Sequence, residues 1–378
     1  MLTSATRRLP PLYTHPIGSL PRPQMVRDLL ACRDDLPADR FVGLLDDAVR
    51  VAINLQELAG LDVVSDGEWR RVQYIREFLL RTGGFERVRR YRHQGETKLT
   101  EVVVRRLPQR ESVFAADARF LVANSRRARK FAIPSPFLIA MRYWHEDYSR
   151  EAYPTWQEFA EHLADVLARE AAAIAAEGID IVQLDDPALT YFCDPALLSG
   201  ETHDDRLRRT WDAGSDLPVA VAAINRVAEG LPAEVHLHCC HSVYKRRSDV
   251  QGDYRPLLPH LAGLRVDRLN LEFAYQATGT PDDLALLPPH LALGMGVVNV
   301  RSERLQTVDE IVTLARAGIA RIGAPRVALN PDCGFAPDAS EPPSIDEAYE
   351  KLKRLAAAAT MLRAEFGVSD GAGRPTAS

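Results

Sequence analysis

From about residue 156 onward, short apolar runs alternate with longer amphipathic stretches along the chain. Residues 156–177 carry apolar side chains at helical spacing and end at Gly178, a residue type that commonly terminates helices. Residues 179–184 follow as a short run of isoleucine, valine and leucine around two polar residues, which is typical of a buried strand. Strands that alternate with helices pair in parallel through crossover helices, so the pattern predicts an α/β protein.

The same alternation extends in both directions and predicts eight strands. They are expected at residues 14–19, 61–66, 130–133, 179–184, 235–240, 269–272, 291–298 and 327–330. Further helices are expected at residues 41–59, 219–230, 257–261, 307–317 and 345–366. Eight parallel strands with intervening helices form a closed (β/α)8 TIM barrel, and an open doubly wound sheet is the alternative.

Residues 85–124 interrupt this order, because polar and β-branched residues alternate there, as in the E-V-V-V-R run at 101–105. Alternation with a period of two predicts strands, so we expect an antiparallel β excursion inserted into the barrel. The pattern as a whole predicts one domain, residues 1–368, with a β insertion at about 85–124 and a disordered tail at 369–378.

The composition is that of an ordinary folded protein, with 46% hydrophobic and 26% charged residues among 378. The formal net charge of -5 provides no global positive field, so neither nucleic acid nor an anionic membrane is an expected partner. No run of about 18 apolar residues is present, and residues 1–11 lack the apolar stretch of a signal peptide, which predicts a cytoplasmic protein. Five cysteines are an odd number and too sparse for a disulfide framework.

Four metal-capable side chains fall at the carboxyl ends of predicted strands. His238 and Cys240 end one strand, Glu272 ends the next, and Cys333 follows the last. Active sites of α/β barrels lie at this rim, and residues two apart on a strand point to the same side. One imidazole, two thiolates and one carboxylate suit zinc. The alternative is that they are ordinary core and loop residues, because buried cysteine commonly packs as a small hydrophobe.

The remaining cysteines and a second histidine are expected to pack or to support the site. Cys239 points to the opposite side of its strand, so we expect it in the core. His236 shares the inward side with His238 one layer deeper and is expected to support the site from behind the ligands. Cys32 and Cys193 show no partner pattern, and we expect both to be structural.

Six short motifs are spread over nearly the whole chain. They read P-I-G-S at 16–19, D-G-E-W-R-R at 66–71, V-Q-L-D-D-P-A at 182–188, H-C-C at 238–240, L-E at 271–272 and N-P-D-C-G at 330–334. Together they resemble the C-terminal catalytic barrel of cobalamin-independent methionine synthase and its single-barrel relatives. The resemblance implies a zinc ion held by His238, Cys240, Glu272 and Cys333, in a barrel whose rim binds homocysteine.

The resemblance also implies where the amino-acid part of the thiol binds. In the family the I-G-S turn binds the carboxylate, which assigns Ile17 and Ser19 here. Two acids bind the ammonium, which assigns Glu68 and Asp185. Two carboxylates suit an ammonium, and such ion pairs gain strength in a site shielded from water. The alternative is that both acids are strand-end residues paired with arginines of the 66–71 motif.

The function that these features imply is that of a zinc-dependent thiol alkyltransferase. By resemblance it is an S-methyltransferase that moves a methyl group to homocysteine through a zinc-bound thiolate. Glu272 is then the expected exchangeable ligand, because a carboxylate oxygen binds zinc less tenaciously than a thiolate does. The expected partners are a small-molecule thiol and a methyl or alkyl donor, and a homo-oligomer stays open.

Two segments depart from the synthase pattern and leave the alkyl donor open among a methylfolate, a methylcorrinoid and an epoxide. Residues 133–137 read I-P-S-P-F where folate-using members carry a G-P-x-T type segment. Residues 296–301 read G-V-V-N-V-R where the synthase has an aspartate and a histidine linked to proton delivery. Asn299 is the candidate catalytic residue of the second segment. Tyr143 and Trp144 are either a stacking surface for a pterin or part of the core.

Three other functions stay open at this point. A transferase for a different thiol, such as one that opens an epoxide with coenzyme M, needs a cation for the sulfonate, for which Arg70, Arg71 or Arg301 is available. The two acids would crowd a sulfonate, which favours an amino-acid thiol. A structural zinc site would be closed by four permanent ligands. A decarboxylase on the related porphyrin-binding barrel would need no metal.

Overall fold

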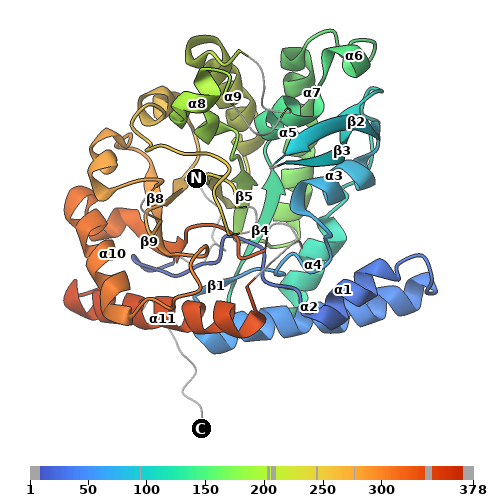
Figure 1. The fold of residues 1–378 in the computed structure, drawn as a ribbon. Helices are drawn as coiled ribbons and strands as arrows, with labels where there is room; N and C mark the ends of the chain where they lie inside the picture. The colour runs from blue at the N-terminus through green and yellow to red at the C-terminus, as the bar shows by residue number, and fades with distance from the viewer. Residues whose placement is uncertain are drawn as a thin grey trace.

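Parallel strands curl around the centre of the molecule, and helices cover them on the outside (Figure 1). The structure is a computed structural model that describes residues 9–93, 95–201, 205, 210–243, 246–275, 277–336 and 343–368. In this part of the chain seven strands follow the order β1-β4-β5-β6-β7-β8-β9. Their bounds are β1 Val63–Val64, β4 Ala128–Pro134, β5 Ile181–Asp185, β6 Glu234–Cys239, β7 Arg268–Glu272, β8 Ala292–Val298 and β9 Val327–Pro331.

The sheet is closed into a barrel by the segment that was expected as the first strand. The backbone N–H of His15 donates to the carbonyl of Leu329 in β9 at 3.1 Å, and the N–H of Val63 in β1 donates to the carbonyl of Thr14 at 3.0 Å. The segment thus bonds both edges of the sheet. The regular pairing stops at Pro16, which has no N–H to donate. The predicted (β/α)8 barrel is confirmed, but the strand expected at 14–19 is reduced to a bridge at Thr14 and the one expected at 61–66 to the two residues of β1.

The covering helices begin and end where local sequence signals place them. Helix α2 ends at Gly60, whose φ of 90° is a left-handed conformation that glycine adopts without strain. Helix α7 begins after Thr155, whose side chain accepts a hydrogen bond from the N–H of Glu158. The helices are α1 Gln24–Ala31, α2 Ala38–Ala59, α3 Tyr74–Thr82, α4 Ala115–Asn124, α5 Pro136–Tyr143, α6 Glu146–Ser149, α7 Trp156–Ala176, α8 Pro195–Leu198, α9 Ala213–Ala228, α10 Val308–Ile322 and α11 Ile345–Glu365. The helix expected at 257–261 is a 3-10 helix, η3 Leu258–Gly263.

The predicted β insertion is correct in its first half and wrong in its second. Strands β2 Phe85–His93 and β3 Glu96–Val103 pair antiparallel, as expected. Residues 115–124 instead form helix α4, because four alanines favour a helix and Ala118 and Leu121 bury one face of it. The β2–β3 hairpin lies beside α5 and α6, above the carboxyl ends of the central strands (Figure 1).

One hydrophobic cluster joins the two ends of the described chain, from Leu12 to Leu362. Strands β5, β7 and β9 are buried along their whole length, as coverage of both faces requires. Because the first and last elements share this core, we propose that residues 1–368 form a single domain. The tail at 369–378 lies outside the described residues. Among the described helices, none has the length and apolar character needed to cross a bilayer.

Candidate metal centre and active site

Three of the four predicted metal ligands meet at the carboxyl rim of the barrel. His238 lies near the end of β6 and Cys240 directly follows that strand, while Cys333 is two residues beyond the end of β9. The imidazole nitrogen and the two sulfurs all lie within 4.8 Å of one another, and all three residues are buried. Parallel strands deliver their carboxyl ends to one rim, which explains how residues almost a hundred positions apart converge.

The neighbours of Cys240 and His238 within the cluster determine what the cluster can bind. A hydrogen bond from Cys333 is the largest influence on Cys240, and with His238 it holds the pKa of the Cys240 thiol well below its usual range. The Nδ1 atom of His238 lies 3.0 Å from Oδ1 of Asp185, whereas its Nε2 atom is buried without a hydrogen-bond partner among the described residues. An imidazole held by a carboxylate, with its other nitrogen facing two sulfurs, is the arrangement of a metal ligand. The donor set fits zinc.

The fourth predicted ligand, Glu272, is not part of this group. Its Oε1 atom accepts a hydrogen bond from Nη2 of Arg301 at 2.7 Å. Its Oε2 atom accepts one from the backbone N–H of His241 at 3.0 Å and lies 2.9 Å from Nδ1 of the same residue. Burial would raise the pKa of the Glu272 carboxyl, but Arg301 and His241 outweigh it and hold that pKa well below its usual range. Glu272 therefore lies outside the group of His238, Cys240 and Cys333 in this structure, and its role as the fourth ligand stays a prediction.

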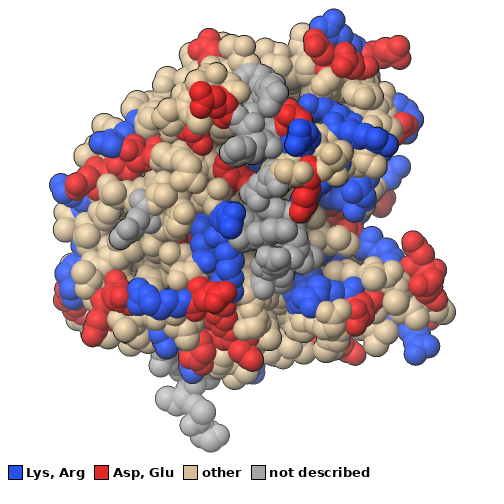
Figure 2. All heavy atoms as spheres, in the orientation of Figure 1, with Lys and Arg blue, Asp and Glu red and all other residues tan. Residues whose placement is uncertain are grey.

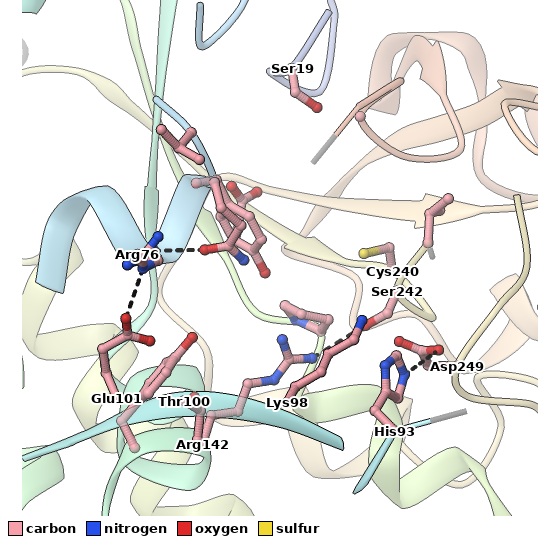
Figure 3. A pocket seen from close by; sticks show the side chains of 18 of the residues that line it. Ser19, Arg76, His93, Lys98, Thr100, Glu101, Arg142, Cys240, Ser242 and Asp249 are labelled. Atoms are coloured by element: carbon pink, nitrogen blue, oxygen red, sulfur yellow. Dashed lines mark hydrogen bonds and ion pairs between the residues drawn. The ribbon is translucent and has the colours of Figure 1, made fainter. Parts of the chain in front are cut away.

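A cavity of about 760 Å³ opens beside the cluster, between the barrel rim and the β2–β3 hairpin (Figure 3). Of the nine predicted site residues, seven line it and two, Glu272 and Asn299, do not. The seven are Ile17, Ser19, Glu68, Asp185, His238, Cys240 and Cys333. In Figure 3 Ser19 lies at the top of the cavity, whereas the hairpin residue Thr100 lies below it and the Lys98 side chain extends toward Ser242.

Glu68 is held in a strained conformation at the edge of the cavity. Its φ of 57° lies in the left-handed region, which is uncommon for a residue with a side chain and is found at functional sites. Its Oε1 atom is 3.8 Å from Nη1 of Arg71, and its Oε2 atom is buried with no partner among the described residues. A Cβ atom at Gly18 would lie only 2.5 Å from Oε1, so this glycine makes room for the carboxylate. Arg71 thus lies near Oε1 of Glu68, and Oε2 remains available to a ligand.

Asp185 and the turn at Ile17 complete the wall next to the metal-capable cluster. Oδ1 of Asp185 accepts a hydrogen bond from Nε2 of Gln183 at 2.7 Å and contacts His238, so its binding capacity toward the cavity lies with Oδ2. Gln183 also donates to the carbonyl of Ile17 at 2.9 Å, which ties the turn to β5. The Oγ atom of Ser19 accepts from the N–H of Ala336 at 3.3 Å.

Asn299 and the aromatic pair of α5 have structural partners. Oδ1 of Asn299 accepts hydrogen bonds from the backbone N–H groups of Arg301 and Ser302, so the side chain shapes the loop after β8. The indole N–H of Trp144 donates to the carbonyl of Tyr153 at 2.9 Å, and Trp144 does not line the cavity. Tyr143 is buried and does line it.

The wall formed by the hairpin was not predicted. It adds His93, Lys98, Arg87 and Arg90 to the cavity, and lysine and arginine side chains gather over β2 and β3 at the upper right of the surface view (Figure 2). His93 is 3.2 Å from Asp249, which joins the hairpin to the loop after β6. The arginine run at 87–92 was a signal in the sequence, but nothing in it indicated that the hairpin folds back over the barrel rim.

His236 and Cys239 lie where the strand alternation placed them. His236 is buried below His238, and its Nδ1 atom is 3.3 Å from Nδ2 of Asn270, which in turn donates to Gln183. It therefore reaches the Asp185–His238 pair only through two amides. Cys239 is buried in the hydrophobic core, as is Cys193, whereas Cys32 is exposed.

These features define an α/β-barrel protein with a cluster of one histidine and two cysteines that could hold a metal ion, beside a large cavity at its carboxyl rim. Residues 139–361 match the family described as the catalytic domain of cobalamin-independent synthase. The chain belongs to this family, which confirms the resemblance seen in the motifs.

Several relatives match along nearly the whole chain. A methionine synthase of Pyrococcus abyssi is 29% identical, over 95% of this chain and 95% of the relative, and one of Thermococcus kodakarensis is 28% identical over the same shares. Among solved structures, a B12-independent methionine synthase of Shewanella sp. W3-18-1 in complex with selenomethionine has a TM-score of 0.77 and 24% identity, with 94% of this chain and 98% of that one covered. A methyltransferase of Methanosarcina mazei has a TM-score of 0.59 and 14% identity, with 93% and 94% covered. These two structures support the barrel fold.

Proposed function

We propose that this protein is a homocysteine S-methyltransferase, a cobalamin-independent methionine synthase with zinc in its active site. The observation that carries the proposal is the contact of one cavity with both the His238, Cys240 and Cys333 cluster and the acids Glu68 and Asp185. A sulfur nucleophile with an ammonium group needs both features. The curated relatives that bear the name methionine synthase support the same function.

In this proposal different residues of the chain bind different groups of the substrate. Glu68 and Asp185 each offer a carboxylate oxygen without a described partner to the ammonium, in a site shielded from water. The turn at Ile17 and Ser19 binds the carboxylate of the thiol amino acid. His238, Cys240 and Cys333 hold zinc. When bound there, zinc lowers the pKa of a thiol and so supplies a thiolate nucleophile at neutral pH.

The methyl donor binds against the hairpin, because the other wall of the cavity is used by the thiol amino acid. Arg142 on α5 lines the cavity there with its guanidinium bonded to the Tyr191 hydroxyl at 2.7 Å and the Ser242 hydroxyl at 3.3 Å. The partners of the Arg142 guanidinium in the described part of the chain are thus hydroxyl groups and not carboxylates. This wall suits a donor with anionic groups.

The competing function is that of a purely structural zinc site. Structural zinc sites are closed by four permanent ligands, whereas catalytic sites keep a position open. The cluster borders a cavity large enough for a small-molecule substrate, which favours catalysis.

The proposed reaction is tested by offering the purified protein homocysteine or coenzyme M with methylfolate, methylcobalamin or a small epoxide, and identifying the thioether by mass. We expect methionine from homocysteine and at least one methyl donor. A product only from coenzyme M, or no product with any pair at full zinc content, would contradict the proposal. X-ray absorption provides a second readout, because added homocysteine should raise the number of sulfur atoms around zinc by one.

Activity toward the thiol amino acid should fall as the pH drops below 7. Burial raises the pKa of the Glu68 carboxyl to about 7, with Arg71 opposing and Asp185 adding to the rise. The carboxylate that attracts the ammonium is present above this pKa and is lost by protonation below it. We therefore expect kcat/KM for homocysteine to fall about tenfold per pH unit below 7.

The control for this pH dependence is 2-mercaptoethanol, a thiol without an ammonium group. Protonation of the thiol or of a metal ligand lowers kcat/KM for both thiols. The additional fall of kcat/KM with homocysteine therefore measures the effect of protonating Glu68. In the Glu68→Gln variant the additional fall should vanish. Equal slopes for the two thiols in the unmodified protein would show that Glu68 does not bind the ammonium.

A further inference from the structure

Three successive carbonyl groups of the turn at residues 16–19 accept hydrogen bonds from side chains of the barrel. The bonds run from Lys130 to the carbonyl of Pro16, from Gln183 to that of Ile17 and from Ser65 to that of Gly18, each at 2.9 Å. In a trans peptide group the N–H points opposite to the C=O, so the N–H groups of residues 17–19 point away from these donors.

The N–H groups on the other side of the turn are available to a ligand. Those of Ile17, Gly18 and Ser19 form no hydrogen bond within the described part of the chain. Ile17 and Ser19 line the cavity. Successive backbone N–H groups that face one space attract an anion, so the orientation of these peptide groups determines how well a carboxylate binds.

Lys130 is the donor that holds the first of these peptide groups against the barrel. Among the described residues, two side chains contact the Pro16 carbonyl, Nζ of Lys130 at 2.9 Å and Nδ1 of His15 at 3.0 Å. His15 precedes Pro16 in the same segment, so its contact does not fix the segment relative to a neighbouring strand. The amine of Lys130 comes from β4 and does so.

The surroundings of Lys130 show that its hydrogen bond is the purpose of the buried amine. The side chain is fully buried, and Nζ also lies 2.9 Å from Nδ1 of His15. Burial lowers the pKa of the amine well below its usual range, against the opposing effect of Asp185. An amine keeps N–H bonds in both protonation states, so it donates to the Pro16 carbonyl in either one.

We infer that Lys130 is a positioning residue that ties the Pro16 carbonyl to β4 and so directs the N–H of Ile17 at the carboxylate of the thiol amino acid. The inference rests on the proposed function and adds to it a residue that does not line the cavity. Lys130 acts on the substrate only through the turn. Donors that are held in place before binding do not have to be ordered when the substrate binds, which favours affinity.

The binding of two thiols to the Lys130→Met variant tests this inference. L-Homocysteine and 3-mercaptopropylamine share the thiol and the ammonium group, and only L-homocysteine has the carboxylate. Isothermal titration calorimetry on the zinc-loaded protein gives both Kd values without a methyl donor. We expect Lys130→Met to raise the Kd of L-homocysteine about tenfold and to leave that of 3-mercaptopropylamine within twofold, because about one hydrogen bond to the carboxylate is lost.

Two results would overturn the inference. An equal loss for both thiols would show that Lys130 supports the site as a whole, and unchanged Kd values for both would show that the turn keeps its orientation without the amine. Methionine is flexible and fills irregular core space, so the variant should fold. If it does not, Lys130→Gln, whose shorter side chain ends before the position of Nζ, carries the same comparison.

The matched control is Lys351→Met. Lys351 is also a buried lysine, and its Nζ atom donates to the carbonyl of Ser302 and to Glu347, away from the residues that line the cavity. We expect this variant to bind both thiols as the unmodified protein does. A tenfold loss that is confined to L-homocysteine in Lys351→Met as well would show that the effect is not specific to Lys130 and would overturn the inference.

The unmodified protein separates this inference from the proposed function. If it binds L-homocysteine and 3-mercaptopropylamine with equal Kd, the turn does not bind a carboxylate, and the assignment of Ile17 and Ser19 fails together with the inference. If it binds L-homocysteine more tightly and Lys130→Met keeps that preference in full, the inference fails and the proposed function stands.

Discussion

Cys333→Ser should bind zinc about 100- to 1,000-fold more weakly than the unmodified protein and lose methyl transfer at ordinary metal concentrations. Structural zinc sites with four ligands are worth about 10–16 kcal/mol, which is about 3 kcal/mol for each ligand. The barrel should still fold, because Cys333 is one member of a large apolar core formed by the strands and the covering helices. Zinc content after dialysis, the circular dichroism spectrum and turnover are the three measurements.

The matched control is Cys239→Ala. Cys239 is as deeply buried as Cys333 and adjacent to a proposed ligand, but it lies in the core outside the metal-capable group. We expect this variant to keep its zinc and to change only the stability of the fold. Turnover by Cys333→Ser at zero zinc content would contradict the metal assignment, and equal zinc loss in both variants would point to a general collapse of the rim.

Asp185→Asn should weaken both substrate binding and metal binding. The variant removes one of two charges proposed to attract the ammonium, and close charge pairs in shielded sites are worth about 2–5 kcal/mol, so KM for homocysteine should rise about 100-fold. It also replaces the carboxylate that contacts Nδ1 of His238 by a neutral amide, which should lower zinc affinity about tenfold. Steady-state kinetics and a chelator titration measure the two effects separately.

Glu68→Gln is the comparison for Asp185→Asn. Glu68 lines the same cavity, yet it makes no hydrogen bond to a metal-capable residue in the described part of the chain. We expect a similar rise of KM for homocysteine with zinc affinity unchanged. A loss of zinc affinity in Glu68→Gln as large as in Asp185→Asn would show that Glu68 supports the metal and not the substrate.

Much of the rim could be predicted because, in a barrel of parallel strands, the residues that end successive strands lie close together in space. His238, Cys240 and Cys333 were recognisable as residues at strand ends, and parallel strands bring such ends to one side. The helices were predictable to within a few residues where caps such as Thr155 and Gly60 mark them. The alanines of α4 favour a helix, but its start is fixed by Ser112, Val113 and Phe114, which donate hydrogen bonds to Glu170 of the distant helix α7, and that contact has no signal in the local sequence.

The sequence by itself therefore determined the α/β class, the barrel and the three residues of the metal-capable cluster, because these depend on periodicity and on topology. Only the tertiary structure decided that the arginine-rich hairpin forms one wall of the cavity and that the carboxylate of Glu272 faces Arg301. That ion pair joins the last residue of β7 to a residue 29 positions later in the loop after β8. Whether the Glu272 carboxylate lies against Arg301 or beside the metal-capable cluster depends on distances of a few ångströms. The packing of the whole barrel sets those distances.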